Sequence, residues 1–245
     1  MYKITNVLIA MALLLSYLLV LPAAAQRIDL SSWSATTIIV DHPNHGEWLL
    51  FDDNRNVIQA EQCSPSFFHN NIDESNFMMS CTVFVSEYSD DDLIGFAFGY
   101  QDPGHCYILD WKKTAQGSAG NFRDEGFVIR KMHGDLADMT FEDYWGHVDG
   151  AERYTVLDSY LGTGLGWRPF TFYDFTLEFS SGSFVVILHE GDTEVWTAVI
   201  DDGDYTSGEF AFYCYSQSSV VFTGFDQGPV LTEQHTWSEV KALYR

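Results

Sequence analysis

The sequence has few basic residues: 12 Lys and Arg stand against 35 Asp and Glu in 245 residues, which gives a formal net charge of −23. Proteins that bind nucleic acid or anionic lipid do so through clusters of Lys and Arg that neutralise phosphate groups. Because this chain has so few cations, we exclude nucleic acid and anionic membrane surfaces as its partners. We also exclude a disordered chain, since 46% of the residues are hydrophobic and 16% are aromatic.

Long apolar runs are also scarce, and the single candidate occupies residues 7–21. Lys3 precedes it and Ala23, Ala24 and Ala25 follow it, an order that is typical of a secretory signal peptide and its cleavage site. The run is shorter than the roughly 20 apolar residues that a transmembrane helix needs. We therefore expect cleavage after Ala25, no membrane insertion after that cleavage, and a secreted, extracellular protein (periplasmic or at the cell surface if the source is bacterial).

Cysteine occurs four times, at Cys63, Cys81, Cys106 and Cys214, and no two of these residues form a Cys-x-x-Cys pair. This spacing argues against a zinc knuckle or a thioredoxin-type site. An even number of cysteines after a signal peptide favours two disulfides, for which three pairings are possible. We favour Cys63–Cys81, which is local, and Cys106–Cys214, which would tie two distant strands. Free thiols are the alternative, above all at Cys214.

Motifs of common enzymes are missing. The chain contains neither the Gly-x-Ser-x-Gly elbow of serine hydrolases nor the Gly-x-x-x-x-Gly-Lys loop that binds nucleotide phosphates. Glu190, Asp192 and Glu194 have the alternate spacing that would place glycoside hydrolase carboxylates on one face of a strand. Gly191 and Asp192, however, fall between two strand-like runs, so we interpret this segment as a hairpin tip. We predict a protein that is not an enzyme, with a glycoside hydrolase as the alternative.

Long helical periodicity is absent, and the apolar stretches have the composition of β-strands. They are rich in β-branched and aromatic residues, about six residues long, and bounded by Gly, Asp, Asn, Ser or Pro. Tight-turn sequences such as Asp102-Pro103-Gly104 join several of them. Two antiparallel sheets packed face to face, as in a jelly roll, are therefore expected. The expected strands are residues 37–40, 48–51, 77–85, 93–100, 106–111, 127–132, 154–157, 170–179, 184–189, 195–200, 209–215 and 220–225.

The domain organisation follows from these assignments. We expect a signal peptide at residues 1–25, a lead segment at 26–46, one β-sandwich at 47–226, and a linker with a short helix at 227–245. The helix prediction rests on Thr236 as a cap, a glutamate three residues later, and apolar Trp237, Val240 and Leu243 along one side. No internal repeat or low-complexity linker divides the chain.

Acidic residues are clustered at the ends of the predicted strands. The clusters are Asp90-Asp91-Asp92, then Asp201-Asp202-Gly203-Asp204, and Asp52-Asp53-Asn54. Adjacent carboxylates repel one another unless a cation lies among them, and Ca²⁺ takes six to eight oxygen ligands from carboxylates and carbonyls. We predict Ca²⁺ at Asp90, Asp91 and Asp92, and assign Asp201, Asp202 and Asp204 as a second candidate set. None of the clusters has the spacing of an EF-hand loop, and solvated acidic turns are the alternative interpretation.

Tryptophan supplies the candidate ligand-binding residues. Most aromatic side chains in a β-sandwich fill its core, but exposed rings can stack on sugars. Trp145 and Trp167 lie in the regions of the sequence that look like loops. We therefore assign these two residues as the candidates for contact with a ligand.

Two segments resemble the signature of the thrombospondin C-terminal domain. The first is Asp-Asp-Asp-Leu-Ile-Gly-Phe-Ala-Phe-Gly-Tyr-Gln-Asp from residue 90, and the second is Cys-Tyr-Ile-Leu-Asp-Trp-Lys-Lys from residue 106. Further features follow in the order of that family: Gly166-Trp167, the strands flanking Glu190-Gly191, Ile200-Asp201 and residues 212–217. The resemblance extends from about Trp48 to Phe225, and it is closer to the stand-alone domains of secreted bacterial proteins.

This resemblance implies a curved β-sandwich of the L-type lectin, or concanavalin-like, kind. Members of the family are extracellular, bind calcium and take part in cell adhesion or matrix contacts. The match places Asp90, Asp91 and Asp92 on the acidic turn of the family and Cys214 on its cysteine in the last strands. The Asp-rich calcium repeats that precede the domain in thrombospondins are missing here, and residues 124–160 match poorly apart from the surroundings of Trp145.

The combined expectation is a secreted, calcium-binding recognition or adhesion module that binds an extracellular glycan or protein without catalysis. Two alternatives stay open at this point. One is a carbohydrate-active enzyme on the same architecture, and the other is a purely structural cell-surface protein.

Overall fold

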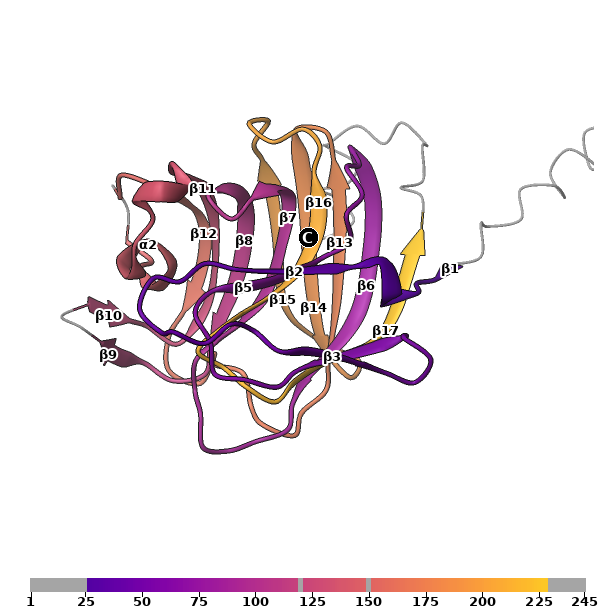
Figure 1. The fold of residues 1–245 in the computed structure, drawn as a ribbon, viewed down its shortest axis with the longest axis horizontal. Coiled ribbons are helices and arrows are strands. Elements are labelled where there is room, and N and C mark those ends of the chain that lie inside the picture. The colour runs from indigo at the N-terminus through magenta and orange to yellow at the C-terminus, as the bar shows by residue number, and fades with distance from the viewer. Residues whose placement is uncertain (1–25, 119–120, 149–150, 229–245) are drawn as a thin grey trace, which may run out of the picture.

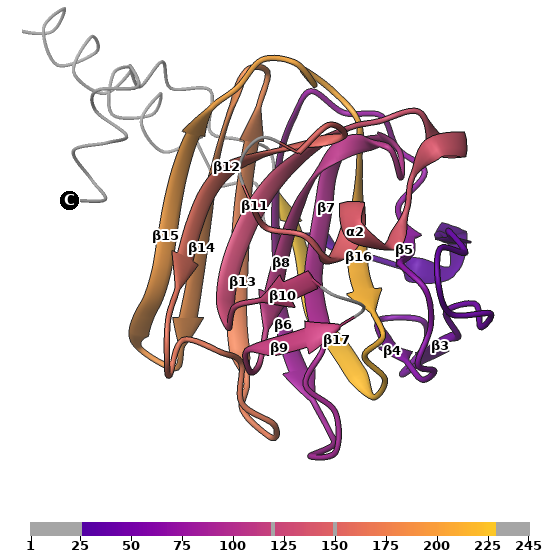
Figure 2. The same cartoon turned by 90° about the vertical axis from the view of Figure 1, so that its left-hand side faces the viewer.

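Strands form most of the regular structure in the computed structural model, which describes residues 26–118, 121–148 and 151–228. They assemble into two large antiparallel sheets that pack face to face (Figures 1 and 2). The prediction of an all-β sandwich of the lectin-like kind is confirmed. The predicted signal peptide and the predicted helix after residue 235 lie outside the described residues. Within those residues, no helix is long and apolar enough to cross a membrane.

The first sheet has the strand order β15-β14-β13-β6-β17-β4-β3, and β1 pairs with β17 beside this path. In this sheet, β6 lies between β13 and β17, two strands that follow it much later in the sequence. The strands are β1 (Gln26–Arg27), β3 (Trp48–Phe51), β4 (Asn56–Gln59), β6 (Asn76–Val85), β13 (Tyr173–Ser180), β14 (Ser183–Glu190), β15 (Thr193–Asp201) and β17 (Val220–Gly228).

The second sheet has the strand order β12-β11-β8-β7-β16-β5-β2. A small hairpin of β9 (Gln116–Ser118) and β10 (Asn121–Arg123) and two of the three short helical segments in the described residues accompany it. The strands are β2 (Ser34–Thr37), β5 (Ser66–His69), β7 (Leu93–Asp102), β8 (His105–Lys112), β11 (Gly126–His133), β12 (Tyr154–Leu161) and β16 (Glu209–Tyr215). The helical segments are η1 (Leu30–Ser32), η2 (Leu136–Asp138) and α2 (Phe141–Trp145).

The burial pattern explains why each strand lies where it does. Buried and partly exposed residues alternate along β6, because one face of it contacts the core between the sheets. β7 and β8 carry nearly continuous apolar runs and are buried on both faces. One face of these two strands contacts the first sheet, and α2 with its neighbouring segments covers the other (Figure 2). The central strands of the second sheet are thus enclosed between two layers.

Most of the expected strands occur, but their ends differ in informative places. The expected strand at residues 170–179 begins at Tyr173, because Phe170 has a positive φ of 57° that ends extended pairing. The expected strand at 37–40 occurs earlier, as β2. The sequence analysis missed β4, β5 and the β9–β10 hairpin, which are short and contain polar residues.

The lead segment expected at residues 26–46 is part of the sandwich. β1 pairs with β17 in the first sheet, and β2 pairs with β5 at the edge of the second. Leu30 and Trp33, between these strands, are buried in the core between the sheets. The expected domain boundary at residue 47 is therefore corrected, and the sandwich begins before it.

The predicted disulfides are wrong, because all four cysteines are free and buried. Cys106 lies in the cluster on the outer face of the second sheet, whereas Cys214 lies in the core between the sheets. The two thiols therefore face opposite sides of one sheet and cannot pair. The Cys63 thiol accepts a hydrogen bond from Gln59 Nε2 at 2.8 Å, outside the core that holds Cys81. Burial raises the pKa of these thiols, which makes them unreactive.

Candidate functional site

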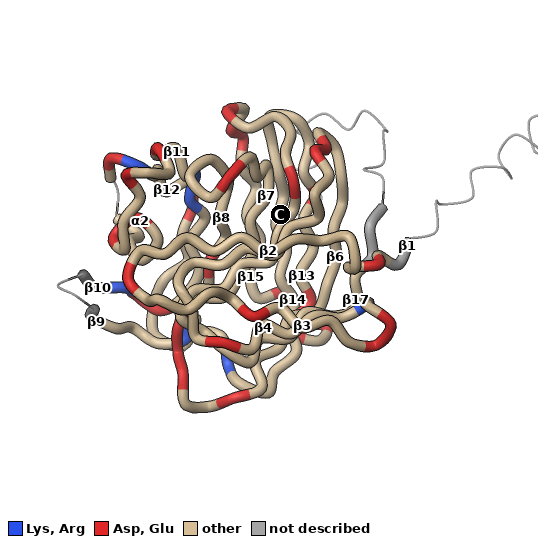
Figure 3. The backbone as a smooth tube through the Cα atoms, viewed as in Figure 1, with Lys and Arg blue, Asp and Glu red and all other residues tan. Residues whose placement is uncertain are grey.

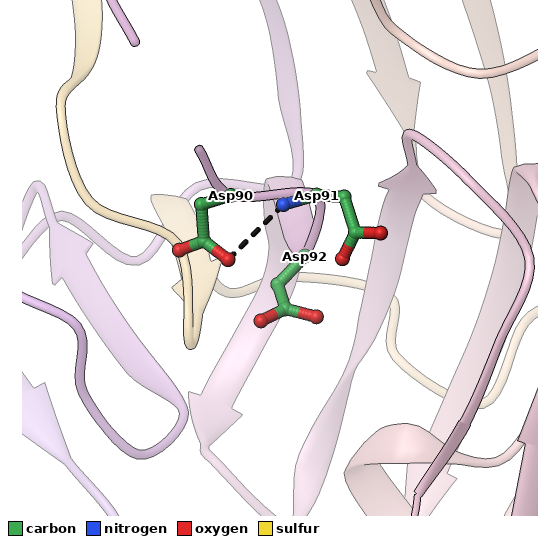
Figure 4. Close-up of side chains that lie close together, drawn as sticks. All are labelled: Asp90, Asp91 and Asp92. Atoms are coloured by element: carbon green, nitrogen blue, oxygen red, sulfur yellow. Dashed lines mark hydrogen bonds between the residues drawn. The ribbon is translucent and has the colours of Figure 1, made fainter. Parts of the chain in front are cut away.

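Asp and Glu residues lie mainly in the connections between strands (Figure 3). One connection brings the carboxylates of three of them together. Asp90, Asp91 and Asp92 form the turn that leads into β7, and their carboxylates are directed to the same side of the chain (Figure 4). Each offers an oxygen within 4.8 Å of those of the other two. In the part of the chain that the structure describes, no other group of three His, Cys, Asp or Glu side chains meets this spacing. We call this group the acidic turn.

A buried lysine lies under the acidic turn. The register of the β7–β8 hairpin places Lys112 opposite Leu93, the residue that follows Asp92. The Lys112 side chain is fully buried, and its Nζ donates to Asp91 Oδ1 at 2.8 Å and to Asp92 Oδ1 at 3.0 Å. It also donates to the carbonyl oxygen of Asp91 at 2.5 Å and to Gln116 Oε1 at 2.7 Å. Lys112 is thus a buried cation that binds two of the three carboxylates.

The acidic turn keeps an excess of negative charge despite this lysine. Burial raises the pKa of Asp92 to about 6; the Lys112 ammonium opposes this shift and the Asp90 carboxylate adds to it. Burial would also raise the pKa of Asp91, but hydrogen bonds from Lys112 and Thr114 outweigh it and hold that pKa below its usual value. Three carboxylates around one ammonium form an oxygen-rich, anionic site of the kind that suits a hard divalent cation. The residues present therefore fit Ca²⁺.

Trp167 holds the acidic turn in place and does not face a ligand. Its ring is 1% exposed, and its indole Nε1 donates to the carbonyl oxygen of Asp92 at 3.0 Å. Gln217 Oε1 accepts a hydrogen bond from the Asp92 N–H at 3.0 Å, and Gln62 Nε2 donates to Asp90 Oδ2 at 2.8 Å. The prediction of Trp167 as a ligand-facing residue is therefore wrong, since the ring is buried in the core between the sheets.

Trp145 is also buried, so its assignment as a ligand-facing residue is wrong too. It ends α2, is 3% exposed, and packs on the outer face of the second sheet. The Lys112 ammonium lies 5.3 Å from the centre of its ring. This cation–π contact adds to the stabilisation of the buried lysine. Both tryptophans thus support the acidic turn from inside the protein.

The second acidic cluster is organised around Lys131 of β11. Lys131 Nζ donates to Asp202 Oδ2 at 2.6 Å and also contacts Asp204 Oδ2, at 2.5 Å. The Tyr107 hydroxyl donates to Asp202 Oδ1 at 2.7 Å. Asp201 is the last residue of β15. The three carboxylates predicted as a calcium site do not gather at the spacing found in the acidic turn, because Asp202 and Asp204 are directed at a lysine.

The ion pair between Asp202 and Lys131 predicts an acid-dependent loss of stability. Burial would raise the pKa of Asp202, but the Lys131 ammonium and the Tyr107 hydroxyl outweigh it and hold this pKa below 3.8. The carboxylate therefore stabilises the fold above about pH 4, and this contribution is lost as the pH falls through the folded pKa. We expect Asp202→Asn to lower the free energy of unfolding by about 1–2 kcal/mol at neutral pH.

Urea unfolding at a series of pH values from neutral to acid measures this effect. The difference between the wild type and Asp202→Asn should shrink in acid, whereas the exposed-site control Asp53→Asn should show no such trend. A difference between wild type and Asp202→Asn that is constant across the series would contradict the ion-pair interpretation.

The third acidic cluster is a tight turn between β3 and β4. Asp52, Asp53 and Asn54 all have left-handed backbone conformations, with φ between 53° and 61°. Asp and Asn tolerate this conformation better than other residues that carry a Cβ atom. The turn geometry therefore accounts for this cluster.

Sequence reasoning missed a buried charge network on the outer face of the second sheet. Asp110 of β8 accepts hydrogen bonds from Arg123 and Arg130, and all three side chains are fully buried. Arg130 also donates to the carbonyl oxygens of Asp143 at 2.6 Å and Tyr144 at 2.9 Å. The network thus fixes α2 against β8 and β11. Asp110, a charged residue inside the apolar run of β8, was the signal in the sequence that could have identified this network.

The segment weighed as a pair of catalytic carboxylates is a hairpin tip, as predicted. β14 ends at Glu190 and β15 begins at Thr193, so Gly191 and Asp192 form the turn. Glu190 forms an ion pair with Arg168, and Asp192 and Glu194 are exposed. The exposed positions of Asp192 and Glu194 differ from the buried setting of the general acid in a glycoside hydrolase.

The sequence was compared with protein-family models and with known proteins. The model of the thrombospondin C-terminal region matches residues 43–227. Thrombospondin-3 of Mus musculus is 25% identical over 203 residues, which cover 76% of this chain and 21% of that protein. Thrombospondin-1 of Xenopus laevis is 23% identical over 192 residues, which cover 72% of this chain and 16% of that protein. The chain thus spans about a fifth or less of the length of these two relatives.

Two solved structures share the sandwich. The exoplasmic/lumenal domain of VIP36 in its Ca²⁺/Man2-bound form has a TM-score of 0.53 at 12% identity, over 85% of each chain. The carbohydrate-binding module CBM66 from Bacillus subtilis has a TM-score of 0.51 at 12% identity, over 80% of this chain and 95% of that one. These likenesses show a common fold. Because the family match covers three quarters of the sequence and includes the acidic turn, the chain belongs to the thrombospondin C-terminal region family.

Proposed function

We infer that this protein is a secreted, calcium-binding recognition module that binds an extracellular glycan and is not an enzyme. The observation that carries the proposal is the acidic turn, which gathers three carboxylates at the end of a lectin-like sandwich. VIP36, which shares the fold, has been solved with Ca²⁺ and mannose ligands, and CBM66 is a carbohydrate-binding module. The apolar run at residues 7–21 supports export.

Calcium fits the acidic turn because the turn offers more oxygen atoms and negative charge than one lysine can satisfy. Asp90, Asp91 and Asp92 would hold the ion, and it would supply the positive charge that their carboxylates lack. Lys112 binds two of these carboxylates, those of Asp91 and Asp92, from the interior side. The lysine and the ion would therefore act together, the lysine as a permanent counter-charge and calcium as one that depends on its concentration.

Calcium should raise the melting temperature of the protein. An ion that binds the folded state alone contributes about 2.7 kcal/mol to the free energy of unfolding at a concentration one hundred times its Kd. We therefore expect a chelator to lower the melting temperature of wild type and added CaCl₂ to restore it. Asp90→Asn should weaken this response, because it removes one charged oxygen ligand while keeping the size of the side chain.

Asp53→Asn is the matched control, because it removes the same charge from an exposed turn on the first sheet. Differential scanning calorimetry in chelator, CaCl₂ and MgCl₂ distinguishes specific binding from charge screening. Identical melting of wild type in chelator and in CaCl₂ would overturn the calcium part of the proposal.

A further inference from the structure

Four aromatic side chains form a connected, exposed group on the first sheet and the loops beside it. Tyr88, Phe170 and Phe172 are 73%, 49% and 59% exposed, and Phe84 of β6 is half-buried between them. Phe172 stacks on Phe84 with ring centres 4.8 Å apart, and Phe170 contacts Phe84 at 6.3 Å. Tyr88 contacts Phe170 at 4.8 Å. We call these four residues the aromatic surface.

The aromatic surface adjoins the acidic turn. Tyr88 precedes Asp90 by two residues, and Lys113 Nζ donates to the carbonyl oxygens of both, at 2.9 Å and 2.8 Å. One lysine therefore fixes the backbone that carries the outermost ring and the first carboxylate. The backbone that carries Tyr88 is thus tied to the backbone of the predicted calcium ligands.

The backbone holds Phe170 in a conformation that is unfavourable for a bulky residue. Its φ of 57° lies in the left-handed region, where side chains with a Cβ atom are strained. The Phe170 N–H donates to the carbonyl oxygen of Val85 at 2.8 Å, which fixes this geometry at the end of β6. Strained residues of this kind concentrate at binding sites. The strain here places one aromatic ring between Phe84 and Tyr88.

We propose that the aromatic surface binds the apolar faces of neutral sugar rings. The C–H groups on one face of a pyranose carry partial positive charge and match the negative face of an aromatic ring. Hydroxyl groups at the edge of such a sugar would reach the neighbouring acidic turn, where they can donate hydrogen bonds to its carboxylates. This inference rests on the proposed glycan-binding function and assigns that function to particular residues.

The size and charge of the region favour a glycan over other partners. With about 150–250 Å² for one aromatic side chain, the three most exposed rings present about 270–450 Å². A stable protein interface covers roughly 800 Å² on each partner, whereas functional patches on monomers cover roughly 300–600 Å². The acidic turn and the net charge of −23 repel anionic lipid and acidic sugars. A neutral oligosaccharide fits both the area and the charge.

An array of neutral and acidic oligosaccharides, probed with the full chain in CaCl₂, tests this assignment. We expect wild type to bind neutral glycans, and Tyr88→Ala and Phe172→Ala to weaken binding of the best free oligosaccharide at least tenfold in calorimetric titrations. Phe122→Ala is the matched control, because Phe122 is 58% exposed, lies on β10 and is not one of the four residues of the aromatic surface. Unchanged melting temperatures show that the variants are folded.

Each outcome decides a separate question. Binding by wild type that Tyr88→Ala and Phe172→Ala retain would overturn the aromatic surface as the site and leave the proposed function standing. No binding by wild type to any glycan would overturn both. Preference for acidic glycans, or sedimentation showing that Phe172→Ala breaks a dimer of wild type, would overturn the neutral-sugar assignment.

Discussion

Replacing Lys112 by methionine is expected to lower the free energy of unfolding by about 3–5 kcal/mol in the presence of chelator, because it leaves buried carboxylate charge without its partner. Lys112 is fully buried and is the internal cation of the acidic turn, bound to Asp91 and Asp92. Methionine keeps the length and the apolar stem of the side chain. The change therefore tests the charge with little loss of packing.

Calcium should rescue this variant more than it stabilises wild type. Without the lysine, the three carboxylates repel one another more strongly, so an added divalent cation relieves a larger repulsion. Urea unfolding in chelator and in CaCl₂ measures both effects. Lys113→Met is the comparison, because the Lys113 ammonium donates to backbone carbonyls next to the turn and acts on the Asp91 carboxylate through its charge without a hydrogen bond, so its loss should cost less. A Lys112→Met protein as stable as Lys113→Met in chelator would show that the buried ion pairs contribute little.

The acidic turn could be located from the sequence, but its counter-charge could not. Three consecutive aspartates before an apolar strand indicate an unusual concentration of charge in any fold. Lys112 is 20 residues away, and only the register of the β7–β8 hairpin brings it opposite Leu93. A shift of one residue in that register would have directed the lysine to the other face of the sheet. Pairing of charges across strands therefore depends on the register, which composition does not reveal.

The aromatic residues show the same limit. Strand-like composition predicted the sandwich well, because β-branched and aromatic runs bounded by turns indicate strands in any register. It did not tell core rings from exposed ones: Trp145 and Trp167 are buried, whereas Phe170 and Phe172 are exposed. The tryptophans lie in segments that fold back onto the sheets. The two phenylalanines lie at the end of an expected strand that a single left-handed residue cuts short.

The second large effect is expected for Asp110→Asn. Asp110 forms ion pairs with both the Arg123 and the Arg130 guanidinium, and the three side chains are fully buried. Asparagine keeps the shape but leaves two buried cations without a charged partner. Breaking one buried ion pair costs about 3–5 kcal/mol, so loss of both pairs is expected to bring the protein close to unfolding. Asp174→Asn is the control, because Asp174 of β13 is exposed and its carboxylate accepts a hydrogen bond from the neutral Thr82 hydroxyl.

The charges in this network also predict which of two variants is the more stable. Two guanidiniums and one carboxylate leave one excess positive charge in the interior, so removal of one arginine restores a neutral pair. We therefore expect Arg123→Met to cost clearly less than Asp110→Asn, although both break one or more hydrogen bonds. Urea unfolding of the two variants gives this order directly. If Arg123→Met and Asp110→Asn lower the free energy of unfolding equally, charge does not hold α2 on the sheet. Side-chain packing would then hold it, because a packing effect does not depend on the sign of the charge that is removed.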